Sequence, residues 1–270
     1  MVVTLRNNPD SAPGKRGPTL SCVLILLPPS ETKTERMRGR PADPSRLSFP
    51  ELTDRRAAVA RELAAVSAAA DAPTQLGVSA NLTADIARNT RLASSPAVTA
   101  ADLYTGVLYD ALDLPSLDPA ARRRAGRWLV VVSALYGALR PGDKVAPYRL
   151  SMGVNLGALG PLAAVWREPL AEVLPRVAGR GVVVDCRSST YAAAWAPRGP
   201  LADRWVQVRG PGATHMAKHT RGLVARHLCQ VGTDARTPQA LQQVAEQAFE
   251  TTLTPPRRDG QPWVLDTRAR

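Results

Sequence analysis

The stretch CVLILLPPSETK, residues 22–33, contains a continuous apolar run that ends at two prolines and leads into polar residues. Such a run predicts a strand that is covered on both faces and is followed by a loop. Two other stretches share the pattern, WLVVVSALYG (128–137) and GVVVDCRSSTY (181–191). Helical patterns lie between the three strands, so we expect a mixed α/β fold with a central mixed sheet and flanking helices.

The remaining segments predict helices and two further strands. Apolar spacing predicts helices over residues 50–71, part of 98–113, 119–126, 160–177 with interruptions at Pro169 and Pro175, 213–229 and 237–253. Alternation in RWVQVRG (204–210) predicts an edge strand, and residues 261–268 a last strand. We expect residues 1–21 to be a disordered extension and residues 22–270 to form one domain, with a helical subregion at about 50–127.

Positive charge is concentrated in two parts of the 270-residue chain, which has a formal net charge of +12. Residues 122–149 contain seven basic residues and one acidic residue, and residues 198–227 contain six basic residues and one acidic residue. A concentrated positive field favours an anionic partner, either nucleic acid or a phosphorylated small molecule. The alternative is that these arginines and lysines are ordinary solvated surface residues.

Cysteine usage and hydropathy limit the class of protein. The three cysteines are far apart in sequence and form no CxxC motif, which favours a reducing cytoplasm over a disulfide framework. No apolar run approaches the roughly 20 residues of a membrane-spanning helix, so we expect no membrane partner. The chain has no P-loop, no GxGxxG after a strand and no GxSxG, and we expect neither a cofactor nor a bound metal.

The three strong strands each lead into a loop that contains polar, tyrosine or basic residues. Ligands of α/β proteins bind outside the carboxyl ends of the strands. If the strands are parallel neighbours, their loops bring together Ser30, Lys33, Ser133, Tyr136, Arg140, Ser188, Ser189 and Tyr191 in one cleft suited to anions. The alternative is three unconnected hydrophilic loops.

The loop SALYGALRPGDKVAPYRLSMG, residues 133–153, combines apolar residues with tyrosines, arginines, prolines and glycines. Its prolines fix the backbone, and its apolar residues predict that the loop is held against the body of the protein. Arg140 and Arg149 could hold phosphate oxygens, and Tyr148 could stack or donate a hydrogen bond. The alternative is that Tyr136 and Tyr148 are buried packing residues.

The helix ATHMAKHTRGLVARHLC (213–229) carries basic side chains on one face. His215 and His219 have a spacing that can bind a metal, but the positive surroundings and missing acidic ligands argue against it. Lys218 and Arg221 favour a helix that faces phosphates, and a solvated helix is the alternative.

The turn around Gly77, in TQLGVSANLTADIAR, faintly resembles a helix-hairpin-helix element that binds the DNA backbone through turn amides. An ordinary surface helical hairpin explains it as well.

The motifs LILLPPSETK, YTGVLYDAL, SALYGALRPGDKVAPYRLSMG, DCRSSTY and AKHTRGLVARHL, in this order, resemble the YaaA (UPF0246, DUF328) family of peroxide stress proteins. The resemblance implies a cytoplasmic protein with a mixed α/β fold and a positively charged cleft. It also implies a role in peroxide protection through lower free iron, and DNA binding through a helix-hairpin-helix element near Gly77. Thr190 departs from the family pattern, which often has an acid before the tyrosine of the third strand loop.

Two functions follow as alternatives. The first is a DNA-binding stress protein, with backbone contacts from Gly77, Arg122, Arg123 and Arg124. The second is an enzyme of the transferase or hydrolase class that acts on a nucleotide, a nucleobase or another phosphorylated small molecule. Its candidate catalytic residues are Lys33, Tyr136, Arg140, Ser189 and Tyr191, and its candidate phosphate ligands are Ser30, Ser133, Tyr148, Arg149, Ser188, Lys218 and Arg221. Direct iron binding is weaker, because oxygen-rich ligand clusters are missing.

Overall fold

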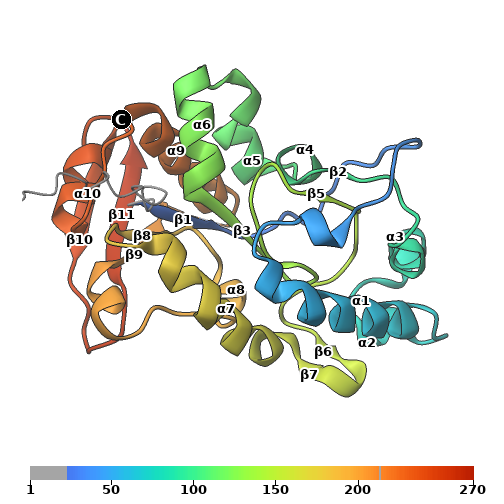
Figure 1. The fold of residues 1–270 in the computed structure, drawn as a ribbon. Helices are drawn as coiled ribbons and strands as arrows, with labels where there is room; N and C mark the ends of the chain where they lie inside the picture. Colours follow the sequence, from blue (N-terminus) through green and yellow to red (C-terminus); the bar gives the residue numbers. More distant parts are fainter. Residues whose placement is uncertain (1–22, 213) are drawn as a thin grey trace, which may run out of the picture.

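The computed structural model describes residues 23–212 and 214–270, so the expectations for residues 1–21 and Cys22 fall outside it. In these residues the main sheet has seven strands in the order β10-β11-β9-β8-β1-β3-β4 (Figure 1). The strands are β1 Leu24–Leu27, β3 Leu129–Ser133, β4 Gly137–Leu139, β8 Val183–Asp185, β9 Trp205–Arg209, β10 Phe249–Thr254 and β11 Trp263–Ala269. Two short ribbons pair β2 Val98–Thr99 with β5 Lys144–Val145, and β6 Asn155–Leu156 with β7 Gly160–Pro161.

The three strands expected from apolar runs form the centre of this sheet. β1 pairs in parallel with β3 on one side and with β8 on the other. Every residue of the three strands is buried. The prediction of a mixed α/β fold is therefore confirmed, and three of the polar loops begin at the same edge of the sheet.

Helices cover both faces of the sheet. The α-helices are α1 Thr53–Ser67, α2 Ala72–Gln75, α3 Thr83–Arg88, α4 Ala100–Leu103, α5 Val107–Leu112, α6 Pro119–Trp128, α7 Leu162–Ala178, α8 Ser189–Ala192, α9 Thr214–Val231 and α10 Pro238–Ala245. In Figure 1, α6 and α9 lie above the strands and α7 lies below them. In the part of the chain that the structure describes, no helix is long and apolar enough to cross a membrane.

The α7 helix corrects the expectation that two prolines interrupt this segment. Pro169 and Pro175 lie inside one helix of 17 residues. Its buried face includes Trp166 and Leu170, and the Trp166 indole N–H donates to the carbonyl oxygen of Ala134 at 2.7 Å. Burial of this face offsets the backbone hydrogen bonds that the prolines cannot donate.

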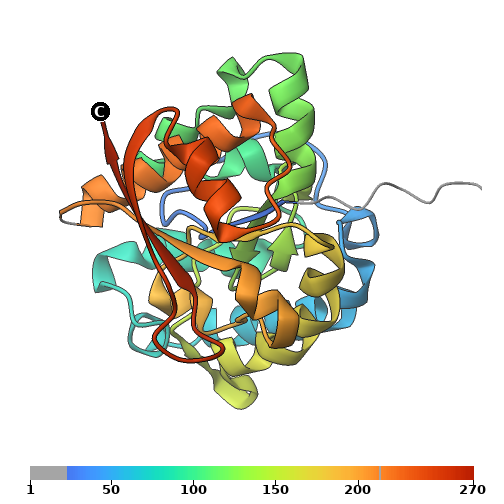
Figure 2. The same ribbon diagram turned by 90° about the vertical axis from the view of Figure 1, so that its left-hand side faces the viewer.

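The carboxyl-terminal region also differs from its prediction. The helix expected over 237–253 ends at Ala245, and Phe249–Thr254 forms β10, which pairs antiparallel with β11. Figure 2 shows this twisted hairpin at the side of the sheet. The alternating burial and the β-branched threonines of β10 suit a strand with one covered face. Because β11 pairs with β9 as well, β9 is an interior strand and the predicted edge position is wrong.

Candidate ligand-binding cavity at the carboxyl ends of β1 and β8

A cavity of about 550 Å³ lies where β1 and β8 end. After β1 the chain continues to β3 on one side, and after β8 it continues to β9 on the other side. Ligand crevices of open α/β sheets form between two neighbouring parallel strands whose following connections run to opposite sides of the sheet. The wall consists of residues 28–33, 77–78, 105–109 and 149–151, together with Ser188, Tyr191, His215, Lys218 and Arg221.

Lys33 is half-buried in this wall. Its ammonium group donates to the carbonyl oxygens of Ser30 at 2.8 Å and Glu31 at 3.3 Å. Burial and, next, the positive charge of Arg149 lower the pKa of Lys33 to about 7, although Glu31 and Asp85 act in the opposite direction. At neutral pH the Lys33 amine is therefore present in both the charged and the neutral form.

Lys33 packs on the ring of Tyr148, which belongs to a buried network of hydroxyl groups. The Nζ atom lies 4.4 Å from the centroid of the Tyr148 ring, a distance typical of a cation–π contact. The Tyr148 hydroxyl lies 2.8 Å from the Ser133 hydroxyl and 3.2 Å from that of Tyr104. Burial raises the pKa of both tyrosines well above the usual value, so both stay neutral. Ser133 and Tyr148, both predicted phosphate ligands, are buried behind the wall instead of lining it.

The loop after β1 is tied to the segment that leads into α5. The Ser30 hydroxyl accepts a hydrogen bond from the Thr105 N–H at 3.1 Å and donates to the carbonyl oxygen of Thr32. The Tyr109 hydroxyl donates to the carbonyl oxygen of Pro28 at 2.6 Å. These contacts hold the loop in place and leave the Lys33 side chain at the cavity.

Arg149 enters the cavity from the long loop that follows β3. Buried Asn89 fixes its backbone on both sides, since the Asn89 amide accepts from the Arg149 N–H at 2.8 Å and donates to its carbonyl at 2.9 Å. The guanidinium forms an ion pair of 3.2 Å with Glu31. Glu31 is the one carboxylate among the described lining residues, which also include Lys33, Lys218 and Arg221.

The α9 helix forms another wall and packs unusually close to α5. A Cβ atom added at Gly222 would lie 2.1 Å from the backbone oxygen of Leu108, so this contact requires glycine. The close approach fixes the position of the helix that carries His215, Lys218 and Arg221 into the cavity. The Arg221 Nε–H donates to the carbonyl oxygen of Val208 at 3.1 Å.

A buried ion pair joins the last residue of β8 to the loop that follows it, and it was not predicted from the sequence. Both Asp185 and Arg187 are fully buried, and the guanidinium donates to the two carboxylate oxygens at 2.8 and 2.7 Å. Arg187 also donates to the carbonyl oxygens of Tyr191 and Trp195 at 3.3 and 2.8 Å. It thereby positions Tyr191, which lines the cavity. The signal in the sequence was an Asp and an Arg two residues apart directly after a buried strand.

Other predicted residues of this loop separate in the structure. Ser188 lines the cavity, whereas exposed Ser189 begins α8 and is missing from the described lining. Burial raises the pKa of Tyr191 to about 12, so its hydroxyl is a neutral donor.

Arg140 and Tyr136 were expected in the cleft, but neither is among the residues that line the cavity. The Arg140 guanidinium donates to the carbonyl oxygens of Arg127 and Leu129 and lies 5.4 Å from the Phe49 ring centroid. The Tyr136 hydroxyl bonds to the backbone of Ala146 at 3.1 Å. Arg140 thereby links the loop after β3 to the end of α6 and the start of β3, and Tyr136 links it to its own backbone at Ala146, because backbone polar groups need hydrogen-bond partners.

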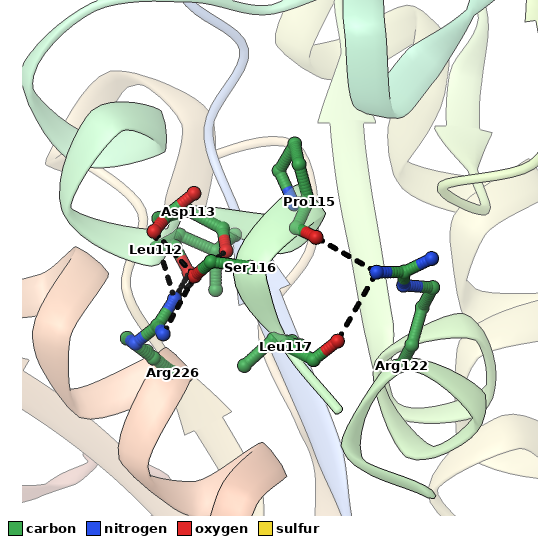
Figure 3. Close-up of polar contacts among 7 residues, drawn as sticks. All are labelled: Leu112, Asp113, Pro115, Ser116, Leu117, Arg122 and Arg226. Carbon is green, nitrogen blue, oxygen red and sulfur yellow. Dashed lines mark hydrogen bonds and ion pairs between the residues drawn. The ribbon is translucent and has the colours of Figure 1, made fainter. Parts of the chain in front are cut away.

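Arg122, Arg123 and Arg124 of α6 lie apart from the cavity as well. Figure 3 shows the Arg122 guanidinium donating to the carbonyl oxygens of Pro115 and Leu117, at 2.7 and 3.1 Å. Arg124 donates to the carbonyl oxygens of Cys229 and Gln230 at 2.6 and 2.7 Å. Arg123 is exposed. Gly77 lines the cavity, and Arg122, Arg123 and Arg124 do not.

The described residues contain no group of side chains suited to bind a metal ion. Across residues 23–212 and 214–270, no group of three or more His, Cys, Asp or Glu side chains could hold an ion.

Together the sheet and its strand-end cavity define an α/β protein with a ligand-sized hollow at a topological switch point. Residues 23–253 match the family model described as peroxide stress protein YaaA, so the chain belongs to this family. It is 46% identical over 253 residues to the UPF0246 protein SCO2297 of Streptomyces coelicolor, covering 90% of this chain and 97% of that protein. It is 40% identical over 237 residues to the UPF0246 protein CE1889 of Corynebacterium efficiens, covering 85% and 94%. It is 31% identical over 250 residues to the UPF0246 protein BURPS668_1321 of Burkholderia pseudomallei, covering 84% and 92%.

Proposed function

We propose that the cavity binds a phosphorylated small molecule and that the protein is an enzyme that acts on it. The observation that carries this proposal is the composition of the wall, in which the described residues include Lys33, Arg149, Lys218 and Arg221 but one carboxylate, that of Glu31. Arginine and lysine hold phosphate oxygens through charge-assisted hydrogen bonds. The volume of about 550 Å³ suits a ligand of nucleotide size.

Lys33 supplies the chemistry in this proposal. General acid–base catalysis is most effective when the pKa of the catalytic group lies near the working pH, and the pKa of Lys33 is about 7. The neutral amine accepts a proton from the bound substrate, and the resulting ammonium group returns it to the product. Tyr191 contributes a neutral hydroxyl donor at the same wall.

Duplex DNA is the competing ligand, favoured by the net charge of +12. Of the α6 arginines predicted to contact DNA, Arg122 and Arg124 donate to carbonyl oxygens of the protein itself, which weakens the case for a DNA surface on that helix. We also propose a cytoplasmic location, in keeping with the buried free thiols of Cys186 and Cys229.

Isothermal titration calorimetry with inorganic phosphate and with duplex DNA tests the proposal. Three proteins are compared: the wild type, Arg221→Gln in the cavity wall, and Arg123→Gln on the exposed side of α6. We expect phosphate binding that Arg221→Gln weakens on the order of tenfold and Arg123→Gln leaves unchanged. Absence of phosphate binding, or duplex binding that Arg123→Gln alone weakens, would overturn the proposal.

A further inference from the structure

Three basic side chains form a row along the wall that α9 contributes. His215, Lys218 and Arg221 follow one another at intervals of three residues, and all three line the cavity. Side chains three residues apart are neighbours on one side of a helix. With a rise of 1.5 Å per residue, the row extends about 9 Å along the helix axis.

The row has an inner and an outer end. Arg221 is half-buried, and its Nε–H bond to the carbonyl of Val208 anchors it near the end of β9. Lys218 and His215 are exposed toward the helix start. Among the described residues, neither has a hydrogen bond or an ion pair, so their donors are available to a ligand.

Two close glycine contacts position the helix that carries the row. Gly222 allows α9 to approach the backbone of Leu108 on α5. A Cβ atom at Gly210 would lie 2.9 Å from the Cα atom of Ala217, so the helix also packs tightly on the chain after β9. A row about 9 Å long exceeds the size of one phosphoryl group, so a chain of phosphoryl groups can pair with each of the three side chains in turn.

We propose that the ligand carries a chain of two or more phosphoryl groups, as in a nucleoside diphosphate or triphosphate, extended along α9. The innermost phosphoryl group binds at Arg221, and the following groups bind at Lys218 and His215. Each added group gains one charge-assisted hydrogen bond partner. This inference rests on the proposed function, because it specifies the ligand class of the same cavity.

Calorimetric titration of the full chain with inorganic orthophosphate, pyrophosphate and tripolyphosphate, in buffer with EDTA and without divalent cations, tests the inference. We expect affinity to rise on the order of tenfold from orthophosphate to pyrophosphate, with a further rise for tripolyphosphate. Equal affinity for the three anions would overturn the chain-length inference and leave phosphate binding intact. Failure of all three to bind would overturn the proposed function itself.

Variants separate the row from general attraction of polyanions. His215→Gln should weaken tripolyphosphate binding several-fold and leave orthophosphate binding unchanged, whereas Arg221→Gln should weaken all three. The matched control is His219→Gln, because His219 is exposed on the same helix and is missing from the described cavity lining. If His219→Gln weakens tripolyphosphate binding as much as His215→Gln does, the gain is nonspecific and the inference is wrong.

Discussion

The α6 helix and the cavity-facing start of α9 are both rich in basic residues, but their side chains have different partners. On α6, Arg122 and Arg124 donate to backbone carbonyl oxygens of neighbouring segments. On α9, Lys218 faces the cavity without a bonded partner among the described residues. The comparison teaches that, of two basic clusters, the one that keeps side-chain donors without an acceptor in the described protein, as at Lys218, is the better candidate for a ligand site.

The α6 arginines stabilise helix ends and turns. Arg124 contacts the last turn of α9, where unpaired carbonyls and the helix dipole favour a cation. Arg226 of α9 donates in return to the carbonyls of Leu112 and Asp113 at 3.0 and 2.7 Å, beside the Arg122 contacts (Figure 3). This region fixes α9 relative to α5, and thereby supports the cavity from a distance.

The largest effect is expected at the glycine that brings α9 onto α5. Gly222→Ala forces a Cβ atom toward the Leu108 backbone oxygen and should lower the free energy of unfolding by about 2–3 kcal/mol. The matched control is Gly126→Ala on α6, where an added Cβ atom meets nothing within 4 Å. Because alanine favours helix, the control should be neutral or stabilising by up to about 1 kcal/mol. Urea unfolding measures both, and a Gly222→Ala protein as stable as the wild type would show that the close contact is not required.

Replacing one basic side chain by glutamine on α6 and one on α9 should affect stability in the first variant and ligand binding in the second. Arg124→Gln removes bonds to two carbonyls and should cost about 1–2 kcal/mol of unfolding free energy, with phosphate affinity retained in the folded protein. Lys218→Gln should leave stability within about 0.5 kcal/mol, because Lys218 is exposed, and should weaken pyrophosphate binding. Urea unfolding and calorimetry on both variants check this crossed pattern. Parallel losses of stability and binding in either variant would contradict the distinction between the two helices.

Part of this distinction could be anticipated from the sequence. The apolar runs predict β1, β3 and β8 as strands covered on both faces, with a shared cleft at their carboxyl ends only if the strands are parallel neighbours. The structure pairs β1 in parallel with both other strands, and Lys33 and Tyr191 line the cavity at this edge. That Arg140 lies outside the cavity lining could not be predicted, because a charge pattern does not reveal that the carbonyls of Arg127 and Leu129 will accept its hydrogen bonds. The β10 strand was missed because its partner, β11, is a later segment, and pairing decides between helix and strand.

The smallest expected effect is a pH dependence that belongs to the cavity alone. Since the pKa of Lys33 is about 7, its positive charge is lost as the pH rises above 7. Affinity for sulfate, whose own charge stays constant in this range, should fall several-fold between pH 7 and 9 in the wild type. Lys33→Arg keeps the charge and should flatten this dependence. Calorimetry across this range checks it, and an equally steep fall in Lys33→Arg would assign the titration to another group.

The most direct test of the central claim, that the cavity is an anion site, is a crystal structure of the protein with tungstate, a heavy analogue of phosphate located by its anomalous scattering. We predict a tungsten peak in the cavity within hydrogen-bond reach of Arg149 and Arg221. An empty cavity in crystals soaked at saturating tungstate, with peaks on the α6 arginines instead, would contradict the claim.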